Sequence, residues 1–312
     1  MDVREEHVMT YATGNLKTVV TSLAAERFRW RQSPSPGSRT TLLLPDLAVR
    51  QAVTDAGTDN VSLVFPMAID GDFVYEVPNS VSIVWTMLTG ITRPPDHVGL
   101  IHEVGQIANR LHTMPPPPGT MTHAPWLKRL QQWLNEPSGK DSERFLFSIL
   151  GEHITRDRWD DLGQWCTELL DSPQSRVLLL GSLLPGEIIA GKQAGSGCVL
   201  AAGSVASGHQ ASDIATLLEG LVTVTEMASR APNLLIEAPD FASLAQAFLV
   251  GYGPMEDDRI VAQTAVLRRL SRLVDVAAHL GWNDYLSDQA AAMARHIDSE
   301  GSSLLEPCEW RR

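Results

Sequence analysis

The pattern of apolar and polar positions divides the chain into a strand-rich beginning and a long helix-rich remainder. Short runs of β-branched and aromatic residues, separated by turn residues, predict strands, and Asp70-Gly71 predicts a tight hairpin turn. The predicted strands lie at 18–21, 27–31, 40–44, 61–67, 73–77 and 81–85, and Leu88-Thr89-Gly90 ends the last of them.

Apolar residues then recur at helical spacing over most of the chain. In the segment 98–114, Val98, Ile101 and Val104 share one face, and the prolines at 115–118 end the helix. An earlier helix is predicted at 46–57, with Asp46 at its N-cap. The other predicted helices are 126–133, 142–154, 159–170, 212–218, 241–251, 257–280 and 282–297, and a loosely held tail follows at 301–312.

The composition is that of a folded globular protein. Hydrophobic residues make up 44% and charged residues 20% of the 312 positions, which argues against disorder. The formal net charge of -12 argues against nonspecific binding to nucleic acid or to an anionic membrane. No apolar run reaches the roughly 20 residues that span a bilayer, and the polar start M-D-V-R-E-E-H is unlike a secretory signal.

The cysteines at 166, 198 and 308 are far apart and have no C-x-x-C spacing. They therefore predict neither a disulfide framework nor a zinc site. We expect reduced thiols in a cytoplasmic protein.

One stretch in the middle of the chain has the pattern of a loop held between two strands. Residues 176–190 read R-V-L-L-L-G-S-L-L-P-G-E-I-I-A. An apolar run ends in a glycine, and a second apolar run follows Pro185-Gly186. This pattern predicts a loop at the floor of a cleft.

Several short motifs occur in order around this loop. They are Leu88-Thr89-Gly90, an A-x-x-L-H helix ending at His112, a strand end at Gly203, a D-I-A helix start at Asp213 and F-L-V-G-Y at 248–252. In this order, the chain resembles the aminoglycoside phosphotransferase branch of the protein-kinase-like fold over residues 60–290. The resemblance implies a bilobal α+β fold with a small β-rich N-lobe at 1–88, a mainly helical C-lobe at 89–300 and the tail at 301–312.

The loop departs from that family at the positions that carry chemistry. The family pattern is roughly H-G-D-x-H-x-x-N. On this pattern, Leu180 and Leu184 replace the two histidines, Ser182 replaces the catalytic aspartate, and Glu187 replaces the metal-binding asparagine. We expect Glu187 to be a solvated loop carboxylate and, without a partner, a weak magnesium ligand.

The second metal position of the family is vacant as well. The resemblance places its aspartate, in I-D-[FW]-G, twelve residues before a D-L-A helix start. Counting back from Asp213 gives Leu200-Ala201-Ala202-Gly203, so Ala201 stands where the family has the ligand. Because the spacing is kept, a slip of alignment is a poor explanation for the missing aspartate.

The family's phosphate contacts have no clear counterpart. The corresponding loop at 23–26 reads L-A-A-E, and its Cβ atoms hinder approach of the backbone amides to a phosphate. The strand that follows offers no lysine, although Arg39 and Arg50 are alternatives.

Other positions predict structural roles. Asp213 is expected to cap its helix and to hold Gly181 and Ser182 by hydrogen bonds, and Gly203 and His112 are expected to be structural. A ligand cage is one interpretation of the cluster of aromatic side chains, but tryptophan at helical spacing more often packs in a core. That cluster comprises Trp126, Trp133, Trp159 and Trp165.

Together these substitutions predict a pseudokinase, a phosphotransferase-like protein that needs no catalytic residue, metal or nucleotide cofactor. The cleft is expected to suit an apolar or peptidic ligand. Its expected lining is Leu180, Ser182, Leu184, Glu187, Ala201 and Trp85. Similar proteins occur beside peptide-modifying enzymes, as in class V lanthipeptide or thioamitide assembly. By that analogy we expect an accessory protein that binds a precursor peptide or a partner enzyme. The sequence does not indicate an oligomeric state.

Two enzymatic alternatives stay open. A lyase or cyclase acting on a modified peptide would use Glu187, His209 or Ser182 as acid–base groups. A divergent small-molecule phosphotransferase would need carboxylates, for which Asp70 and Asp72 are poor substitutes. The sequence offers no G-x-S-x-G elbow, no H-E-x-x-H helix and no dinucleotide-binding fingerprint.

Overall fold

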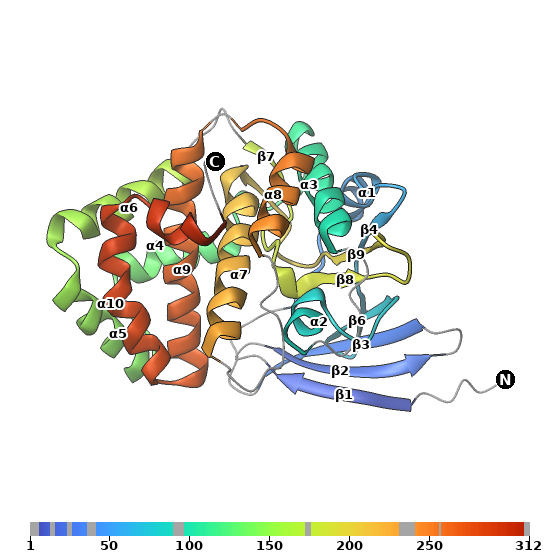
Figure 1. Ribbon diagram of the computed structural model, residues 1–312, viewed down its shortest axis with the longest axis horizontal. Coiled ribbons are helices and arrows are strands. Elements are labelled where there is room, and N and C mark those ends of the chain that lie inside the picture. Colours follow the sequence, from blue (N-terminus) through green and yellow to red (C-terminus); the bar gives the residue numbers. More distant parts are fainter. Residues whose placement is uncertain are drawn as a thin grey trace.

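The structure, a computed structural model, describes residues 6–12, 16–23, 27–35, 42–89, 97–171, 176–230, 241–255 and 257–308. A β-rich N-terminal part lies beside a larger helical part (Figure 1). The bilobal α+β prediction is therefore confirmed.

The N-terminal lobe is built on an antiparallel sheet with the strand order β1-β2-β3-β6-β5. Trp30 and Tyr75, which pair across β3 and β6, are each 1% exposed and anchor the inner face. The predicted turn at Asp70-Gly71 is present, and both residues have the positive φ that such turns require. The strands are β1 Glu6–Ala12, β2 Leu16–Leu23, β3 Arg27–Pro34, β5 Met67–Ile69 and β6 Asp72–Val77.

The first helix and the fourth strand connect this sheet to the rest of the molecule. Helix α1 (Leu47–Asp55) buries Val49 and Val53, and its N-cap Asp46 makes no side-chain capping bond. Strand β4 (Val61–Val64) pairs in parallel with β9 (Gly197–Leu200), which the sequence pattern did not indicate. The two lobes are thus joined by a three-stranded sheet of order β4-β9-β8.

Two strand predictions in the N-terminal lobe are wrong. Residues 83–89 form helix α2 (Ile83–Thr89), because Ile83, Thr86 and Met87 are buried together at helical spacing. Trp85 points away from that buried face and is 46% exposed. Residues 42–44 pair with no strand in the described part of the chain, and 40–41 lie outside it.

The C-terminal lobe is organised around α7, which is buried along most of its length. Helices α3 and α8 cross so closely that a Cβ at Gly105 or Gly251 would meet the backbone of the other helix. The helices are α3 His97–Thr113, α4 Pro125–Asn135, α5 Asp141–His153, α6 Arg156–Asp171, α7 Ala211–Arg230, α8 Phe241–Tyr252, α9 Asp258–Leu280 and α10 Asp284–Asp298.

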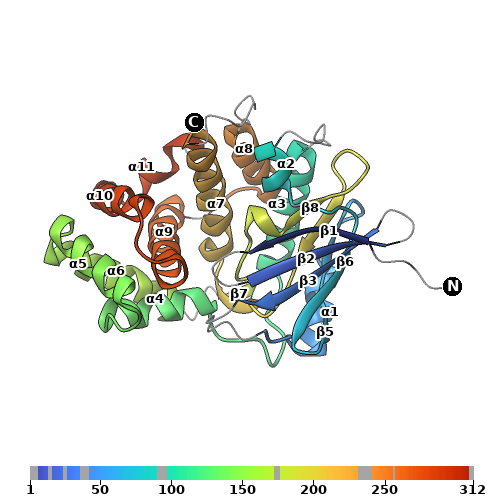
Figure 2. The ribbon, with the colours of Figure 1, turned by 90° about the horizontal axis from the view of Figure 1, so that it is seen from below.

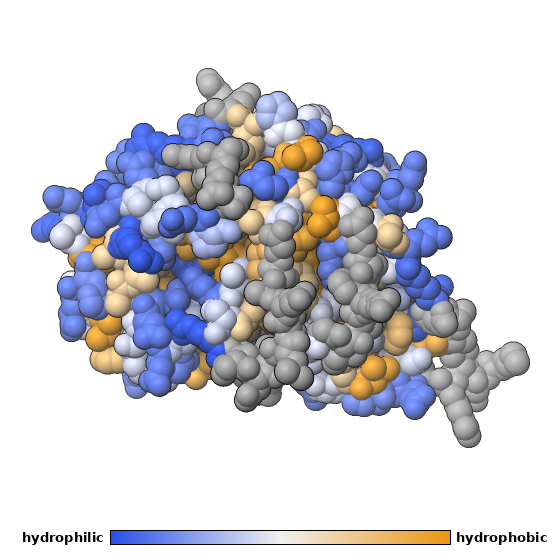
Figure 3. Space-filling view, in the orientation of Figure 1, coloured by the Kyte–Doolittle hydropathy of each residue, from blue (hydrophilic) through white to orange (hydrophobic). Residues whose placement is uncertain are grey.

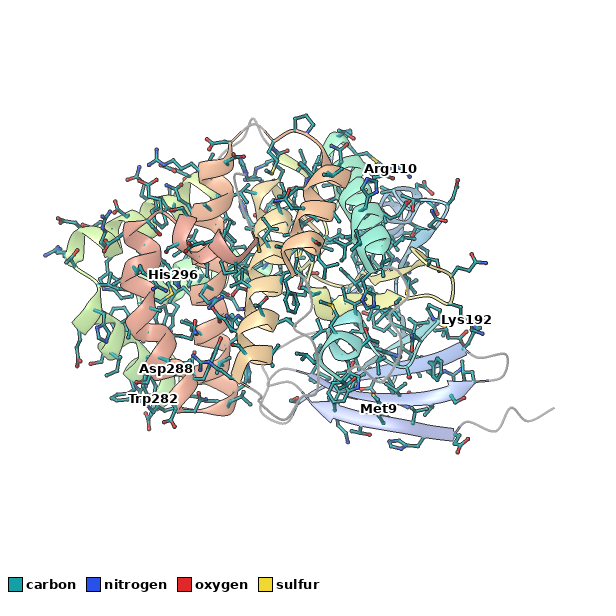
Figure 4. All side chains as sticks on the ribbon, viewed as in Figure 1. Met9, Arg110, Lys192, Trp282, Asp288 and His296 are labelled. Carbon is teal, nitrogen blue, oxygen red and sulfur yellow. The ribbon has the colours of Figure 1, made fainter. Side chains whose placement is uncertain are left out.

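Seen from below, α7 lies between α9 and the strands of the N-terminal lobe (Figure 2). Helices α9 and α10 form a hairpin with Trp282 at its connection and His296 farther along α10 (Figure 4). Lys192, in the β8–β9 turn, projects on the opposite side of the molecule (Figure 4). Within the described ranges, no helix combines the length and apolar character needed to cross a membrane.

The tryptophans of the helical lobe pack in its core. Trp126, Trp133 and Trp165 are at most 7% exposed, and Trp133 contacts Phe147 edge to face at 5.5 Å between ring centroids. The core interpretation of this cluster therefore describes the structure better than a ligand cage.

The predicted loose tail is wrong for the residues that the structure describes. Helix α11 (Ser302–Leu305) and the turn η4 (Glu306–Cys308) bury Leu304, Leu305 and Cys308 to 1% exposure or less. The apolar side chains in this short segment fill a groove against α7, α8 and α9, which sequence spacing alone did not reveal. On the face that Figure 3 shows, apolar residues reach the surface near the middle, over α7 and α8. Val250 of α8 is 69% exposed.

Candidate functional site

The loop singled out by the sequence connects β7 (Arg176–Leu179) to β8 (Ile188–Ala190) and contains the short helix η3 (Pro185–Glu187). Its first turn depends on Gly181, which has a φ of 72°. A Cβ there would collide with the carbonyl oxygen of Ser204, so only glycine fits this approach. The loop is therefore fixed at its start by backbone packing.

Asp213 fixes the same turn with its carboxylate. This side chain, near the start of α7, is completely buried and accepts hydrogen bonds from the backbone N–H groups of Leu180 and Gly181, both at 2.8 Å. A negative charge is also favoured at the N-terminus of a helix. Within the described part of the chain, Asp213 accepts hydrogen bonds from Leu180 and Gly181 but none from Ser182.

His112 extends this support toward the helical core. Its Nε2 lies 3.3 Å from Asp213 Oδ2, and its Nδ1 lies 3.0 Å from the hydroxyl of Tyr252. The Tyr252 hydroxyl in turn donates to Gln210 Oε1 at 3.1 Å. A chain of polar side chains thus ties α3, α7 and α8 to the loop.

Ser182 and Glu187 face each other across the loop. The Ser182 hydroxyl lies 3.5 Å from Glu187 Oε1. Burial raises the pKa of Glu187 from its ordinary value of 4.5 to about 8. The expectation of a solvated carboxylate does not fit: Glu187 is half-buried, and with a pKa of about 8 it is largely protonated near neutral pH.

The groups that surround Glu187 come from both lobes. Tyr75 of β6 and Arg268 of α9 both interact electrostatically with its carboxyl group. Burial raises the pKa of Tyr75 well above its ordinary value, so its hydroxyl stays neutral. Neither residue was singled out from the sequence, because nothing in the local pattern indicates that two distant segments meet at this loop.

Several residues expected to line an open cleft are part of the packed interior. Leu180 and Ala201 are each 3% exposed, whereas Ser182 and Leu184 are half-buried. Trp85 is exposed on α2. Gly203 lies against the backbone of Leu43, where a Cβ would collide with the Leu43 carbonyl oxygen.

An apolar cluster joins the N-terminal sheet to β8 and β9. Trp30 and Tyr75 of the sheet pack with Ile189, Cys198 and Leu200. Leu42 and Leu44 add to the same cluster from the segment before α1. This region is consequently built from apolar side chains.

The donor atoms around the loop do not fit a magnesium-bound nucleotide, the cofactor that the fold implies. Ala201 offers a methyl group, and Asp213, the carboxylate that acts electrostatically on Glu187, already accepts hydrogen bonds with both of its oxygens. Across the described ranges, no group of three or more His, Cys, Asp and Glu side chains is arranged to hold a metal ion.

The cations considered for phosphate binding lie apart from the loop or outside the described residues. Arg39 and the segment 24–26 belong to the undescribed ranges. Arg50 is half-buried on α1, and its Nε has no hydrogen-bond partner within the described part of the chain. Asp70 and Asp72 belong to the β5–β6 hairpin, where Asp72 pairs with Arg31 at 2.5 Å.

His209 does not belong to this site. It pairs with Arg176 at one end of the β7–β10 ladder, whereas the Ser182–Glu187 loop follows the other end. Here β10 is Ala206–His209. His209 instead lines a cavity of about 490 Å³ between α6 and α9, together with Trp165, Leu169 and Gln263. Of the alternative acid–base candidates, His209 therefore lies apart from Ser182 and Glu187.

The two lobes, the β7–β8 loop and its support by Asp213 define the aminoglycoside phosphotransferase-type kinase fold. A spectinomycin phosphotransferase solved with ADP and spectinomycin superposes with a TM-score of 0.54, covering 99% of this chain and 93% of that chain at 11% identity. An amicoumacin kinase superposes with a TM-score of 0.56, covering 94% and 88% at 14% identity.

A Plasmodium vivax ethanolamine kinase superposes with a TM-score of 0.52, covering 96% of this chain and 81% of that chain at 10% identity. No protein-family model matches the chain, and no curated protein matches it in sequence. At identities this low, the superpositions show a shared fold.

The raised pKa of Glu187 predicts a stability difference that depends on pH. A carboxyl group whose pKa is raised by folding destabilises the fold as the pH rises from about 4.5 to about 8. Glu187→Gln should therefore match the wild type near pH 4 and exceed its unfolding free energy by roughly 2–3 kcal/mol at pH 9.

Urea unfolding at several pH values measures this difference. The control is Glu168→Gln on the surface of α6, which should change little at any pH. A parallel pH dependence of the wild type and Glu187→Gln would contradict a buried, neutral Glu187.

Proposed function

We propose that this chain is a pseudokinase that transfers no phosphoryl group and acts by binding a peptide or a partner protein. The observation that carries the proposal is a loop that is held in place by hydrogen bonds and backbone packing but that has no aspartate at the expected catalytic and metal-binding positions. Asp213 and Gly181 hold the loop, yet Ser182 and Ala201 stand at the positions where the resemblance requires aspartates. A phosphoryl transfer site needs those carboxylates for its metal ions and for orienting the attacking group.

The proposed partner is a precursor peptide or the enzyme that modifies it, in a bacterial peptide natural-product pathway. The junction between the lobes supports a binding role, because Tyr75 of one lobe and Arg268 of the other both act electrostatically on Glu187. A ligand that contacts this junction would bridge both lobes.

Thermal unfolding with and without millimolar Mg²⁺-ATP and Mg²⁺-GTP tests the absence of nucleotide binding. A ligand that binds the native state raises its stability by RT ln(1 + [L]/Kd), about 2.7 kcal/mol at a hundred times Kd. We expect the same unfolding midpoint with nucleotide, without nucleotide and with EDTA. A magnesium-dependent rise in the unfolding midpoint would contradict the pseudokinase proposal and favour a phosphotransferase function.

One observation favours a second candidate, a lyase or cyclase in the same cleft. A carboxyl group with a pKa of about 8, next to the Ser182 hydroxyl, is suited to general acid–base catalysis near neutral pH. Glu187→Gln separates the two functions: a binding protein keeps its effect on the modification of the precursor peptide, whereas a cyclase loses product formation. His209→Ala is the control, because His209 lies at the other end of the β7–β10 ladder.

A further inference from the structure

The cavity of about 490 Å³ lies between the last turns of α6 and the first turns of α9, and the end of β10 closes one side of it. Its volume is that of a site for a small molecule. Leu169 and Ile260 make part of its lining apolar. The function proposed for the β7–β8 loop makes no use of this cavity.

Trp165 of α6 brings an indole N–H without an acceptor to the cavity. The residue is 7% exposed, and its Nε1–H donates to no residue that the structure describes. The N–H groups of Trp126 and Trp133 also lack acceptors, but they are sealed from solvent, whereas the Trp165 N–H is not sealed. Because Trp165 lines the cavity, the cavity is where this donor can meet an acceptor from outside.

Gln263 of α9 brings the complementary group, an unpaired acceptor. The residue is 5% exposed, and its Nε2 donates to Glu300 Oε2 at 3.1 Å. A carboxylate only accepts hydrogen bonds, so this contact identifies the nitrogen end of the Gln263 amide. Within the described ranges Gln263 Oε1 accepts no hydrogen bond, and it is not sealed from solvent. The cavity therefore offers a donor on one helix and an acceptor on the other.

Both groups require a partner, because buried polar groups in proteins are nearly always hydrogen-bonded. An amide group of a ligand satisfies both at once, since its oxygen accepts from Trp165 and its N–H donates to Gln263. These two atoms of an amide are separate, as are the two helices that they would contact. A hydroxyl group would have to serve both helices from a single oxygen.

The charges of the lining favour a cation at the mouth of the cavity. Glu168 and Asp171 are exposed and lie one turn apart on α6. Neither forms an ion pair with a described residue, and none of the described lining residues is Lys or Arg. His209 Nδ1 accepts from the Ala211 N–H at 3.2 Å. A ring nitrogen that accepts a hydrogen bond carries no proton, so this imidazole adds no positive charge.

We infer that the cavity binds an amino amide, a compound that carries an amide group and an ammonium group on neighbouring carbon atoms. The amide pairs with Trp165 and Gln263 inside the cavity. The ammonium group faces Glu168 and Asp171 at the mouth, where a carboxylate would be repelled. His209 takes no part in these contacts. The inference does not depend on the function proposed for the β7–β8 loop, because the two sites are separate.

Calorimetric titration of the full chain with L-leucinamide tests the inference. Two matched compounds each remove one group: 3-methylbutylamine lacks the amide, and N-acetyl-L-leucinamide lacks the charge. We expect saturable binding of L-leucinamide at millimolar concentration. Without the amide, binding should weaken about tenfold, because two buried polar groups stay unpaired. Without the charge, it should weaken about threefold, because the carboxylates are exposed.

Variants assign the preference to the residues. Trp165→Phe and Gln263→Met should each reduce the preference for L-leucinamide over 3-methylbutylamine several-fold. Trp133→Phe is the matched control, because it removes a sealed indole N–H elsewhere in the helical lobe and should leave the preference unchanged. Glu168→Gln should reduce the preference over N-acetyl-L-leucinamide, whereas Glu152→Gln, at an exposed position of α5, should not. The comparison of the three compounds on the wild type requires no variant, so it stands even where a variant folds poorly.

No saturable binding of L-leucinamide, or equal binding of 3-methylbutylamine, would overturn the inference. A preference that survives in both Trp165→Phe and Gln263→Met, or tighter binding of L-leucinol than of L-leucinamide, would overturn it as well. L-leucyl-L-alaninamide distinguishes two sources of the same chemistry. Binding at least as tight as that of L-leucinamide supports the amino terminus of a peptide, and weaker binding supports a free amino amide.

The outcome is distinguishable from that of the nucleotide experiment. A magnesium-nucleotide shift would reject the pseudokinase proposal and leave a preference for L-leucinamide in place. Loss of that preference would reject the cavity site and leave the pseudokinase proposal in place.

Discussion

Replacing Arg269 by methionine is expected to lower the free energy of unfolding by about 3–5 kcal/mol, as found when one partner of a buried ion pair is removed. The Arg269 side chain is completely buried between α7, α9 and α10. It donates to Glu219, Glu226 and Gln289, which lie far from it in the sequence. Removal of its charge would leave Glu219, only 1% exposed, with Arg272 as its remaining cationic partner.

The same network predicts how stability responds to acid. Burial raises the pKa of Glu219, but Arg272 and Arg269 more than offset this effect and lower it from 4.5 to about 2. A carboxylate whose pKa is lowered by folding stabilises the protein above pH 4.5, and this contribution is lost as the pH falls toward 2. The wild type should lose stability over that window, and Arg269→Met should lose less because its Glu219 is less favoured in the charged form.

Urea unfolding monitored by circular dichroism measures both effects. Arg259→Met is the control on the same helix; its ion pair with Glu300 is exposed, so a change of about 1 kcal/mol or less is expected. The double variant Arg269→Met/Glu219→Met should recover part of the lost stability, because no buried carboxylate is left unpaired. A cost for Arg269→Met as small as that for Arg259→Met would show that the network does not stabilise the lobe.

The arrangement of long elements followed directly from the sequence. Helices α3, α9 and α10 begin and end close to their predicted positions, because their apolar residues repeat at helical spacing over several turns. The loop between β7 and β8 was also located correctly, since the glycine turn and Pro185-Gly186 bound two short apolar runs. Local pattern determines such features.

The errors fall where tertiary contacts decide between local alternatives. The segment V-S-I-V-W at 81–85 fits a strand, but burial of Ile83, Thr86 and Met87 on one side favours the helix α2. The segment after residue 301 looks polar, yet Leu304, Leu305 and Cys308 pack against the long helices. The helices that these residues contact lie far away in the sequence, so a local sequence pattern cannot indicate the contacts.

The candidate site likewise combines features that the local sequence indicates with features that depend on tertiary contacts. The identities at the loop, Ser182 and Glu187, could be read from the sequence, but the environment of Glu187 could not. Its raised pKa results from burial, and Tyr75 and Arg268, from distant parts of the chain, interact with it electrostatically. The pairing of Arg268 with Trp126 is likewise a product of how α4 packs on α9. The identities of the loop residues therefore came from the sequence, and their surroundings came from the structure.

Replacing Asp213 by alanine is expected to lower the free energy of unfolding by about 3–5 kcal/mol, because each buried donor left without an acceptor costs about 1–3 kcal/mol. The substitution leaves the N–H groups of Leu180 and Gly181 and the ring of His112 without their carboxylate. Amide hydrogen exchange at residues 180–182 should accelerate more than exchange in α3 or α9, since the loop loses its direct support.

Asp257 provides a matched control for Asp213, because it also accepts two backbone N–H groups, those of Arg259 and Ile260, but at an exposed helix start. Asp257→Ala should cost about 1 kcal/mol, the usual value for an N-cap. Asp213→Asn keeps one acceptor oxygen and should fall between Asp213→Ala and the wild type. Equal costs for Asp213→Ala and Asp257→Ala, with unchanged exchange at 180–182, would mean that Gly181 and backbone packing alone hold the loop. The loop could then keep its conformation without the aspartate, and the hydrogen bonds of Asp213 would no longer support the proposed binding function.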